Sequence, residues 1–182
     1  MARARDMVRE HGVDGTSFRR VAKALGVTAP ALYAHVQGYG ELLAAVAADE
    51  FRRLTATFLA VADDDPVARM RRLGHTYVDH ARAEPHLHRL MFRFPPALPA
   101  VDAPAPPFPP ATELFDAAMT PVLAAAAAGR LRPVDPFVAA LGLWSAAHGV
   151  AEVLLMGFDF PDDIADRLID DAIDAAVDHL LA

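Results

Sequence analysis

The chain has 182 residues, a formal net charge of −7 and no cysteine, and 54% of its residues are hydrophobic. This composition is typical of a chain that folds around a core, and it excludes disulfides, thiolate metal sites and cysteine nucleophiles. The longest purely apolar run, residues 122–128, is too short to cross a bilayer, and no apolar segment follows the basic start. We therefore expect a cytoplasmic protein that does not enter a membrane.

Charge is distributed unevenly along the chain. Residues 1–40 carry six basic and three acidic side chains, whereas residues 41–182 carry eleven basic and twenty-one acidic side chains. A polyanionic partner would therefore meet the first forty residues, because the rest of the chain would repel it.

Apolar residues recur at helical spacing along almost the whole chain, and no segment alternates as a strand would. The first helix begins near Arg3, Thr16 or Ser17 can cap the second helix, and Thr28 can cap the third. Further helices are predicted over residues 41–62, 66–82, 85–93, 112–128, 136–157 and 161–181. The expected fold class is all-α with about nine helices, three short ones followed by a larger helical body.

Proline interrupts this pattern in one segment. Residues 94–110 hold eight of the fifteen prolines, which predicts a loop without regular helix. Such a loop is suited to act as a flap over a cavity. Pro121 is expected to kink or split the helix that follows.

Residues 17–36 predict two short helices joined by a tight turn at Gly26-Val27. This arrangement fits a helix-turn-helix, whose second helix can enter the DNA major groove, although an ordinary helical hairpin has the same topology. The second helix exposes small or hydrogen-bonding residues rather than the usual Glu and Lys. That composition favours the DNA-binding interpretation, because small side chains permit close approach to base edges.

Several fixed spacings support a family resemblance. The pieces are Gly15-Thr16-Ser17-Phe18-Arg19-Arg20-Val21-Ala22, Leu25-Gly26-Val27, Pro30-Ala31-Leu32-Tyr33, His35-Val36 and Glu41-Leu42-Leu43. Together they resemble the DNA-binding domain of tetracycline-repressor (TetR) family regulators. The resemblance implies a helix-turn-helix domain over residues 1–46, with its motif at 17–36, and a ligand-binding and dimerisation domain over residues 47–182.

Later pieces resemble a TetR subgroup whose regulatory domain is named for a Trp–His–Gly signature. They are Tyr77-Val78, Glu84-Pro85, Leu90-Met91-Phe92, Leu143-Trp144 and His148-Gly149. This second resemblance extends the likeness over most of the chain.

The family resemblance implies a DNA-binding role for seven residues: Ser17, Arg19, Thr28, Ala29, Ala31, Tyr33 and His35. Thr28, Ala29 and Ala31 would lie at base edges, and Arg19 would reach a base or a phosphate. Tyr33 and His35 would hold phosphates. These roles agree with the chemistry, since arginine binds guanine bidentately and an alanine methyl can contact a thymine methyl.

The chain departs from the family pattern in two places. Residues 38–40 read Gly-Tyr-Gly where family members commonly place a lysine, so we expect one phosphate contact to be missing. The first helix also begins without the usual basic arm before it, which predicts weak DNA binding or an upstream start.

No catalytic or metal-binding group is expected in the body of the protein. Ser145 and His148 could pair as nucleophile and base, but neither an oxyanion-hole loop nor an orienting carboxylate accompanies them. The histidine pairs 86/88 and 75/80 have spacings that do not share one helix face. We therefore expect neither an enzyme nor a cofactor or metal.

Aromatic and methionine side chains in the body suggest a cavity for a small apolar effector, although most of them are also typical of an ordinary core. The candidate residues come from the fifth to eighth predicted helices. They are Tyr77, Leu87, Met91, Phe92, Phe115, Met119, Trp144 and His148.

The last predicted helix has an apolar stripe wider than one core contact needs. Together with small residues in the helix before it, this stripe predicts a symmetric four-helix dimer interface. The interface residues named by this pattern are Ile169, Ile173, Val177 and Leu180.

The sequence therefore predicts a homodimeric transcriptional regulator, a repressor that a small ligand releases from a palindromic double-stranded DNA operator. The alternative is a helical, dimeric, small-molecule-binding protein that has lost DNA binding. The two differ in whether the purified protein shifts DNA from near its own gene.

Overall fold

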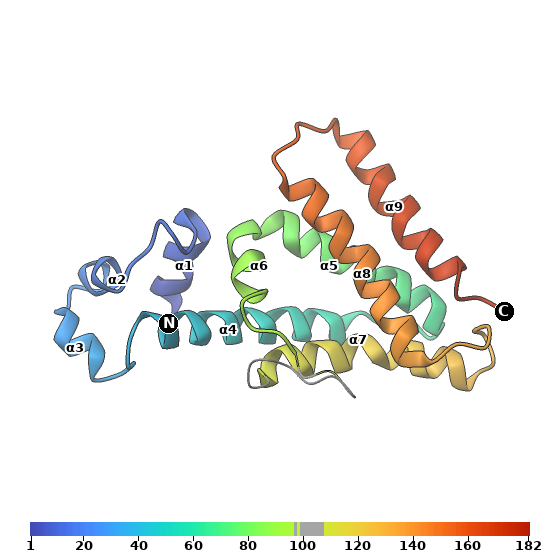
Figure 1. The fold of residues 1–182 in the computed structure, drawn as a ribbon, viewed down its shortest axis with the longest axis horizontal. Coiled ribbons are helices and arrows are strands. Elements are labelled where there is room, and N and C mark those ends of the chain that lie inside the picture. Colours follow the sequence, from blue (N-terminus) through green and yellow to red (C-terminus); the bar gives the residue numbers. More distant parts are fainter. Residues whose placement is uncertain (97, 99–107) are drawn as a thin grey trace. The chain divides into compact units, whose positions relative to one another are not determined.

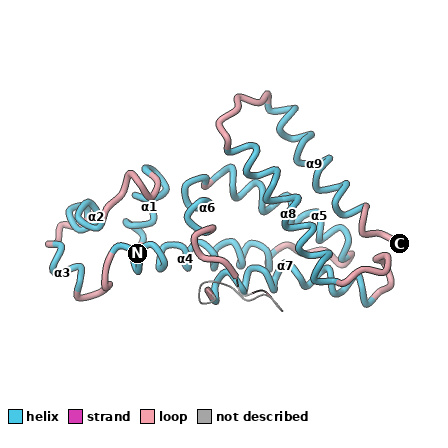
Figure 2. Tube along the Cα trace, viewed as in Figure 1, coloured by secondary structure: helices cyan, strands magenta, loops and turns pink. Residues whose placement is uncertain are grey.

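The computed structural model describes residues 1–96, 98 and 108–182, and these residues form nine helices and no β-strand (Figure 1, Figure 2). The helices are α1 (Ala2–His11), α2 (Phe18–Ala24), α3 (Ala29–Tyr33), α4 (Tyr39–Ala60), α5 (Pro66–Ala83), α6 (Pro85–Met91), α7 (Pro109–Ala127), α8 (Pro136–Leu155) and α9 (Asp162–Asp178). The predicted all-α class is confirmed.

Local signals place the helix starts. The Ser17 hydroxyl accepts a hydrogen bond from the Arg20 amide at 3.3 Å, and the Thr28 hydroxyl accepts one from the Ala31 amide at 3.3 Å. The Asp135 carboxylate accepts one from the Phe137 amide at 2.8 Å. Each side chain satisfies an amide that the first helical turn leaves without a backbone partner.

Prolines lie both at the start of α7 and inside it. This helix begins at Pro109, three residues before the predicted start, because a proline in the first turn forfeits no helical hydrogen bond. Pro121 lies inside α7, which continues past it to Ala127 without being split. Most of the predicted flap, residues 97 and 99–107, lies outside the described residues.

The chain divides into two compact units. Unit 1 comprises residues 1–53 and 84–112, and unit 2 comprises residues 54–83 and 113–182. This division differs from the predicted boundary after residue 46, because α6 packs with the N-terminal helices. Leu87 and Leu90 of α6 are buried in the same apolar cluster as Val8 of α1 and Val46 of α4.

A buried carboxylate links the helices of unit 1. Glu50 of α4 is 2% exposed, and its carboxylate accepts a hydrogen bond from Arg5 Nε of α1 at 2.7 Å. The second guanidinium branch of Arg5 lies 3.5 Å from Glu84, which precedes α6. The hydrogen bond with Glu50 raises the pKa of Arg5, so this arginine stays charged and ties α1 to α4 and to the start of α6.

In unit 2, α5, α8 and α9 pack against one another. Gly74 of α5 lies so close to α9 that a Cβ atom built there would be 2.9 Å from Ile173 Cδ1 and Cγ2. Outside this contact, Arg71 pairs with Asp174 and Asp178, and Arg82 pairs with Asp166 at 3.1 Å. An apolar seam with ion pairs beside it therefore joins α5 to α9.

The residues predicted at the dimer interface also pack inside unit 2. Ile169, Ile173, Val177 and Leu180 are all buried within a single chain. The width of the apolar stripe on α9 thus reflects packing inside unit 2, and of these four side chains only Leu180 also lines a groove at the surface. Exposed apolar side chains lie elsewhere in this unit, among them Val138, Met156, Phe158 and Ile164.

Helix α8 is apolar along its whole length. Among the described residues it is the one helix long and apolar enough to cross a membrane by length and composition, although a single such helix is weak evidence for a membrane span. Only 28% of the most apolar stretch of α8 is buried within the chain. The helix therefore presents apolar surface that unit 2 does not cover.

The Arg5–Glu50 pair generates a stability prediction. Glu50→Leu leaves the Arg5 guanidinium partly buried without its main partner, so we expect the free energy of unfolding to fall by about 3–5 kcal/mol. Adding Arg5→Met to that variant should restore most of the loss, because the unpaired charge is removed. Urea unfolding followed by circular dichroism measures both variants. Equal losses in the single and double variants would contradict the role of the pair.

The close approach at Gly74 generates a second prediction. Gly74→Ala forces a methyl group against the branched Ile173 side chain, so we expect destabilisation of about 1–3 kcal/mol in urea unfolding. Gly40→Ala is the matched control, since Gly40 is also helical and has nothing within 4 Å of a built Cβ. The control should be neutral or slightly stabilising. A Gly74→Ala protein with the unfolding free energy of the wild type would contradict the prediction, because α5 and α9 would then accommodate the methyl group without measurable cost.

Candidate functional site

Helices α2 and α3 form a compact pair joined by residues 25–28. Gly26 has a φ of +70°, a backbone conformation that favours glycine, and the Val27 amide donates to the Ala22 carbonyl at 3.1 Å. The chain thereby turns sharply and Thr28 begins α3 at once. This is the geometry of a helix-turn-helix.

Few contacts hold α3, and they all lie on one side of it. Leu32 is its one buried residue. Tyr33 is 56% exposed, but its ring packs on Phe18 of α2 with the ring centroids 4.5 Å apart. The remaining surface of this short helix is free to meet a partner.

The structure exposes five of the seven predicted DNA-binding residues: Arg19, Thr28, Ala31, Tyr33 and His35. The other two are less accessible. Ala29 is partly buried against the core of unit 1, and the Ser17 hydroxyl caps α2. A capping hydroxyl accepts a hydrogen bond with its oxygen and can still donate its proton, so Ser17 retains a donor for a phosphate.

Residues 15–40 contain no acidic side chain. This stretch also contains two basic residues that were not among the seven predicted DNA-binding residues. Arg20 and Lys23 of α2 are exposed beside Arg19. Arg20 also donates to the Gly15 carbonyl at the start of the motif. The exposed surface of α2 and α3 is therefore basic although the whole chain is acidic, which suits a phosphate backbone.

Buried hydrogen bonds fix the approach to this surface. The Thr16 hydroxyl donates to the Gly12 carbonyl at 2.8 Å, and Gly12 ends α1 with a φ of +68°. The Tyr39 hydroxyl, at the start of α4, donates to the Val13 carbonyl at 2.9 Å. The segments on both sides of α2 and α3 are thus anchored.

A second candidate site lies in unit 2, where three predicted ligand residues form a hydrogen-bonded group. Trp144 Nε1 of α8 lies 3.4 Å from the Tyr77 hydroxyl of α5, which lies 3.3 Å from His148 Nδ1. Because the Tyr77 oxygen accepts from Trp144, its proton is free to donate to His148. The rings of Trp144 and His148 stack with centroids 6.0 Å apart.

Burial sets the protonation of this group. It raises the pKa of Tyr77 far above the ordinary value of a phenol, and it lowers the pKa of His148. At neutral pH the hydroxyl therefore keeps its proton and the imidazole is uncharged. The group offers polar atoms without net charge, as a site for a largely apolar molecule requires.

The remaining predicted ligand residues belong to both units. In unit 2, Phe115 of α7 is buried and packs edge-on against Phe137 of α8, and Met119 is partly buried. In unit 1, Leu87 and Met91 are buried within α6, whereas Phe92 is 40% exposed. Phe92 also contacts the ring of His88.

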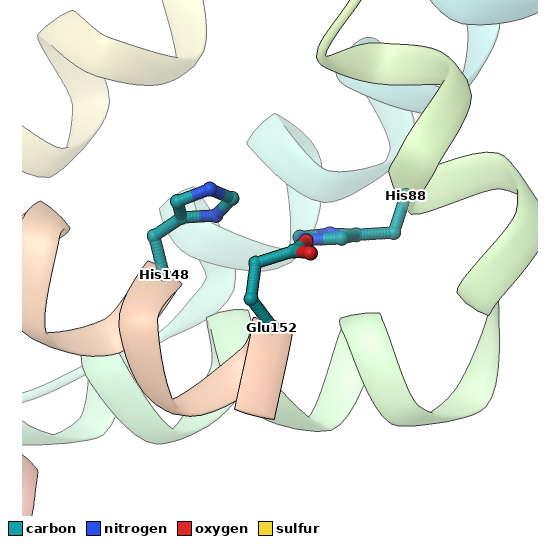
Figure 3. Close-up of side chains that lie close together, drawn as sticks. All are labelled: His88, His148 and Glu152. Carbon is teal, nitrogen blue, oxygen red and sulfur yellow. The ribbon is translucent and has the colours of Figure 1, made fainter. Parts of the chain in front are cut away.

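The arrangement of α8 does not pair Ser145 with His148. The Ser145 hydroxyl donates to the Leu141 carbonyl one turn earlier at 2.7 Å. His148 lies on the face of α8 that also carries Glu152, four residues on (Figure 3). Figure 3 also labels His88, a buried residue of α6 in unit 1. The Ser145 hydroxyl is therefore occupied by a local backbone hydrogen bond.

Two family models match the chain. Residues 1–46 match "Bacterial regulatory proteins, tetR family", and residues 70–176 match "Tetracyclin repressor-like, C-terminal domain". No curated protein sequence matches the chain. The Trp–His–Gly subgroup stays a prediction, because these descriptions name only the wider family.

Solved structures share the fold over the whole chain. A protein of unknown function from Rhodococcus sp. RHA1 is 29% identical with a TM-score of 0.81, covering 100% of this chain and 93% of its own. A putative TetR family transcriptional regulator from Vibrio parahaemolyticus is 21% identical with a TM-score of 0.66, covering 100% and 96%. RolR in complex with resorcinol is 17% identical with a TM-score of 0.67, covering 100% and 85%.

The two family models between them cover the helix-turn-helix of unit 1 and most of unit 2, and the structural likeness extends over the full chain. The chain belongs to the TetR family of bacterial regulatory proteins.

Proposed function

We propose that this TetR-family regulator is a repressor that binds a palindromic DNA operator as a homodimer in the cytoplasm and leaves it when a small apolar effector binds. TetR regulators have a DNA-binding N-terminal domain and a ligand-binding C-terminal domain, and they are not enzymes. One observation carries the proposal: Thr28, Ala31 and Tyr33 are exposed on and beside one short helix, next to a basic and acid-free α2.

The assignment of roles follows from side-chain chemistry. Ala31 and Thr28 lie in the first turn of α3, where short side chains permit contact with base edges, and Arg19 can bind guanine bidentately. Tyr33 and His35 follow at the other end of α3 and can hold phosphates. We infer that residues 1–46 form the DNA-binding domain, with the motif at 17–36.

Homodimerisation is proposed because one recognition helix reads only half of a palindrome. Two copies must present their α3 helices one turn of DNA apart, about 34 Å, to bind both halves. The uncovered apolar surface of α8 supports pairing through α8 and α9. The exposed side chains of these helices would form most of the contact.

The effector is proposed to bind in unit 2 beside Tyr77, Trp144 and His148, with Phe115 and Met119 as apolar residues of the site. Uncharged polar groups among aromatic side chains support a small apolar ligand with one or two hydrogen-bonding groups. A ligand releases DNA only if it binds one conformation of the dimer better than the other. A preference of about 1–3 kcal/mol would change operator affinity by roughly 5–150-fold.

DNA binding by the Arg19→Ala, Tyr33→Phe and His35→Ala variants tests the main proposal. Arg19→Ala should cost about 1–3 kcal/mol and relax preference at one base position. Tyr33→Phe and His35→Ala should weaken binding to all sequences about equally, because phosphates carry no sequence information. Gel shifts with a bound operator and single-base variants of it measure both effects.

Glu113→Ala, an exposed change on α7 in unit 2, is the control and should bind as the wild type does. A wild-type protein that binds no DNA fragment from near its gene would favour the alternative, a small-molecule-binding protein without DNA binding.

The neutral imidazole in unit 2 generates a pH prediction. Because burial lowers the pKa of His148, the unfolded chain takes up a proton more readily than the folded protein near and below the ordinary value of 6.5. The stability that His148 contributes is present above that value and is lost as pH falls. His148→Gln should therefore lose less unfolding free energy than the wild type between pH 7.5 and 5.5. Urea unfolding measures both proteins. If the unfolding free energies of the wild type and His148→Gln fall by the same amount over this pH range, the prediction is contradicted.

A further inference from the structure

The connection between α8 and α9 carries an exposed apolar projection. Met156 is 67% exposed and Phe158 is 61% exposed. The ring of Phe158 packs edge-on against Phe160, with the centroids 5.5 Å apart. Exposed aromatic side chains in a cluster are typical of protein interfaces, because their burial contributes much of the binding free energy.

An apolar groove lies at the opposite end of α8 and α9. It has a volume of about 270 Å³. Its lining comes from the connection before α8, the first turns of α8 and the end of α9: Arg132, Val134, Val138, Ala139, Gly142, Leu143, Ala176, His179 and Leu180. The groove is thus formed by α8 and α9 at the ends that lie away from the connection between them (Figure 1).

One cation, Arg132, lies among the apolar residues of the groove. Arg132 Nε donates to the His179 carbonyl at 2.7 Å, and Arg132 Nη2 lies 2.9 Å from His179 Nε2. The Arg132 amide donates to the Leu180 carbonyl at 2.9 Å, so this part of the chain is held against the end of α9. The arginine is therefore fixed in place and keeps guanidinium donors for an acidic partner.

The projection carries the complementary charge. Asp159 follows Phe158 directly and is exposed. A segment with an aromatic ring beside a carboxylate matches a groove with apolar walls beside a guanidinium. Within one chain the two cannot meet, because about 20 residues of helix at 1.5 Å per residue separate them by about 30 Å.

A second copy of the chain can bring the projection of one chain to the groove of the other. If two α8 helices run antiparallel across a twofold axis near their middle, the end of each helix lies beside the beginning of the other. An isologous interface then forms the same contact twice. Gly142 and Gly149 have nothing within 4 Å of a built Cβ, so the paired helices have room to approach.

We propose that residues 156–160 of each chain dock into the groove of a second copy, with Phe158 between the apolar walls and Asp159 at Arg132. This inference rests on the proposed homodimer and specifies its orientation and its main anchor. The dimer is antiparallel along α8, and the projection and the groove are the two halves of one contact.

The first test measures dimer affinity. Wild-type chain should run at twice its 19.5 kDa mass in size exclusion with light scattering. Phe158→Asp should raise the dimer Kd about 100-fold, because the loss of an anchor worth roughly tenfold occurs at both symmetric contacts. Leu59→Asp is the matched control, since Leu59 is 63% exposed and lies on α4, and it should leave the Kd unchanged.

The second test determines the orientation of the two α8 helices by disulfide cross-linking. The chain has no cysteine of its own, so only introduced cysteines can react. A chain with both Val134→Cys and Phe158→Cys should form disulfide-linked dimers on oxidation, whereas each single variant should remain unlinked. Val138→Cys alone should also stay unlinked, because antiparallel helices place the two copies of this residue about 22 Å apart along the axis. Circular dichroism confirms that each variant is folded.

The outcomes separate this inference from the proposed homodimer. A folded wild-type monomer overturns both. A wild-type dimer that Phe158→Asp leaves intact, with no cross-link between positions 134 and 158, overturns the docking contact and leaves the homodimer standing. Self-linking of Val138→Cys overturns the antiparallel orientation. If Phe158→Asp has the wild-type dimer Kd and an amphiphile copurifies in the groove, another molecule occupies the groove. That result would also overturn the inference.

Discussion

The buried Glu50 carboxylate is the constraint on which the DNA-binding unit depends. A carboxylate that is 2% exposed needs a cation, and Arg5 of α1 supplies it at 2.7 Å. Because Arg5 also reaches Glu84, the same arginine holds α1 to α4 and to the start of α6. The helix-turn-helix follows α1 directly, so this contact holds the frame of α1, α4 and α6 to which the Thr16 and Tyr39 hydrogen bonds and the apolar cluster attach α2 and α3.

The two units use polar groups in different ways. In unit 1 the polar contacts anchor the backbone around α2 and α3 and leave the outer face of α3 exposed. In unit 2, Tyr77, Trp144 and His148 satisfy one another within the packed helices α5 and α8. A surface that stays free suits a large, charged partner, and an internal uncharged group suits a small, apolar one. This contrast supports the division of labour proposed for the regulator.

Sequence reasoning succeeded where the signal is local. Ser17 and Thr28 start helices at positions where the sequence predicts caps, because a capping hydrogen bond spans only about three residues. It failed where long-range packing decides. The apolar stripe of α9 gave no indication that α5 and α8 cover Ile169, Ile173 and Val177, and nothing local places α6 with α1. The burial of Glu50 likewise depends on a residue 45 positions away.

The central claim is that this protein reads a symmetric DNA site with two copies of α3. Selection of bound fragments from a pool of random duplexes by the purified protein tests it directly, because no operator need be known beforehand. The account predicts enrichment of an inverted repeat whose half-sites lie about one helical turn apart, 10–10.5 base pairs from centre to centre, or a multiple of that spacing. Enrichment of a single half-site, or of no sequence, would contradict it.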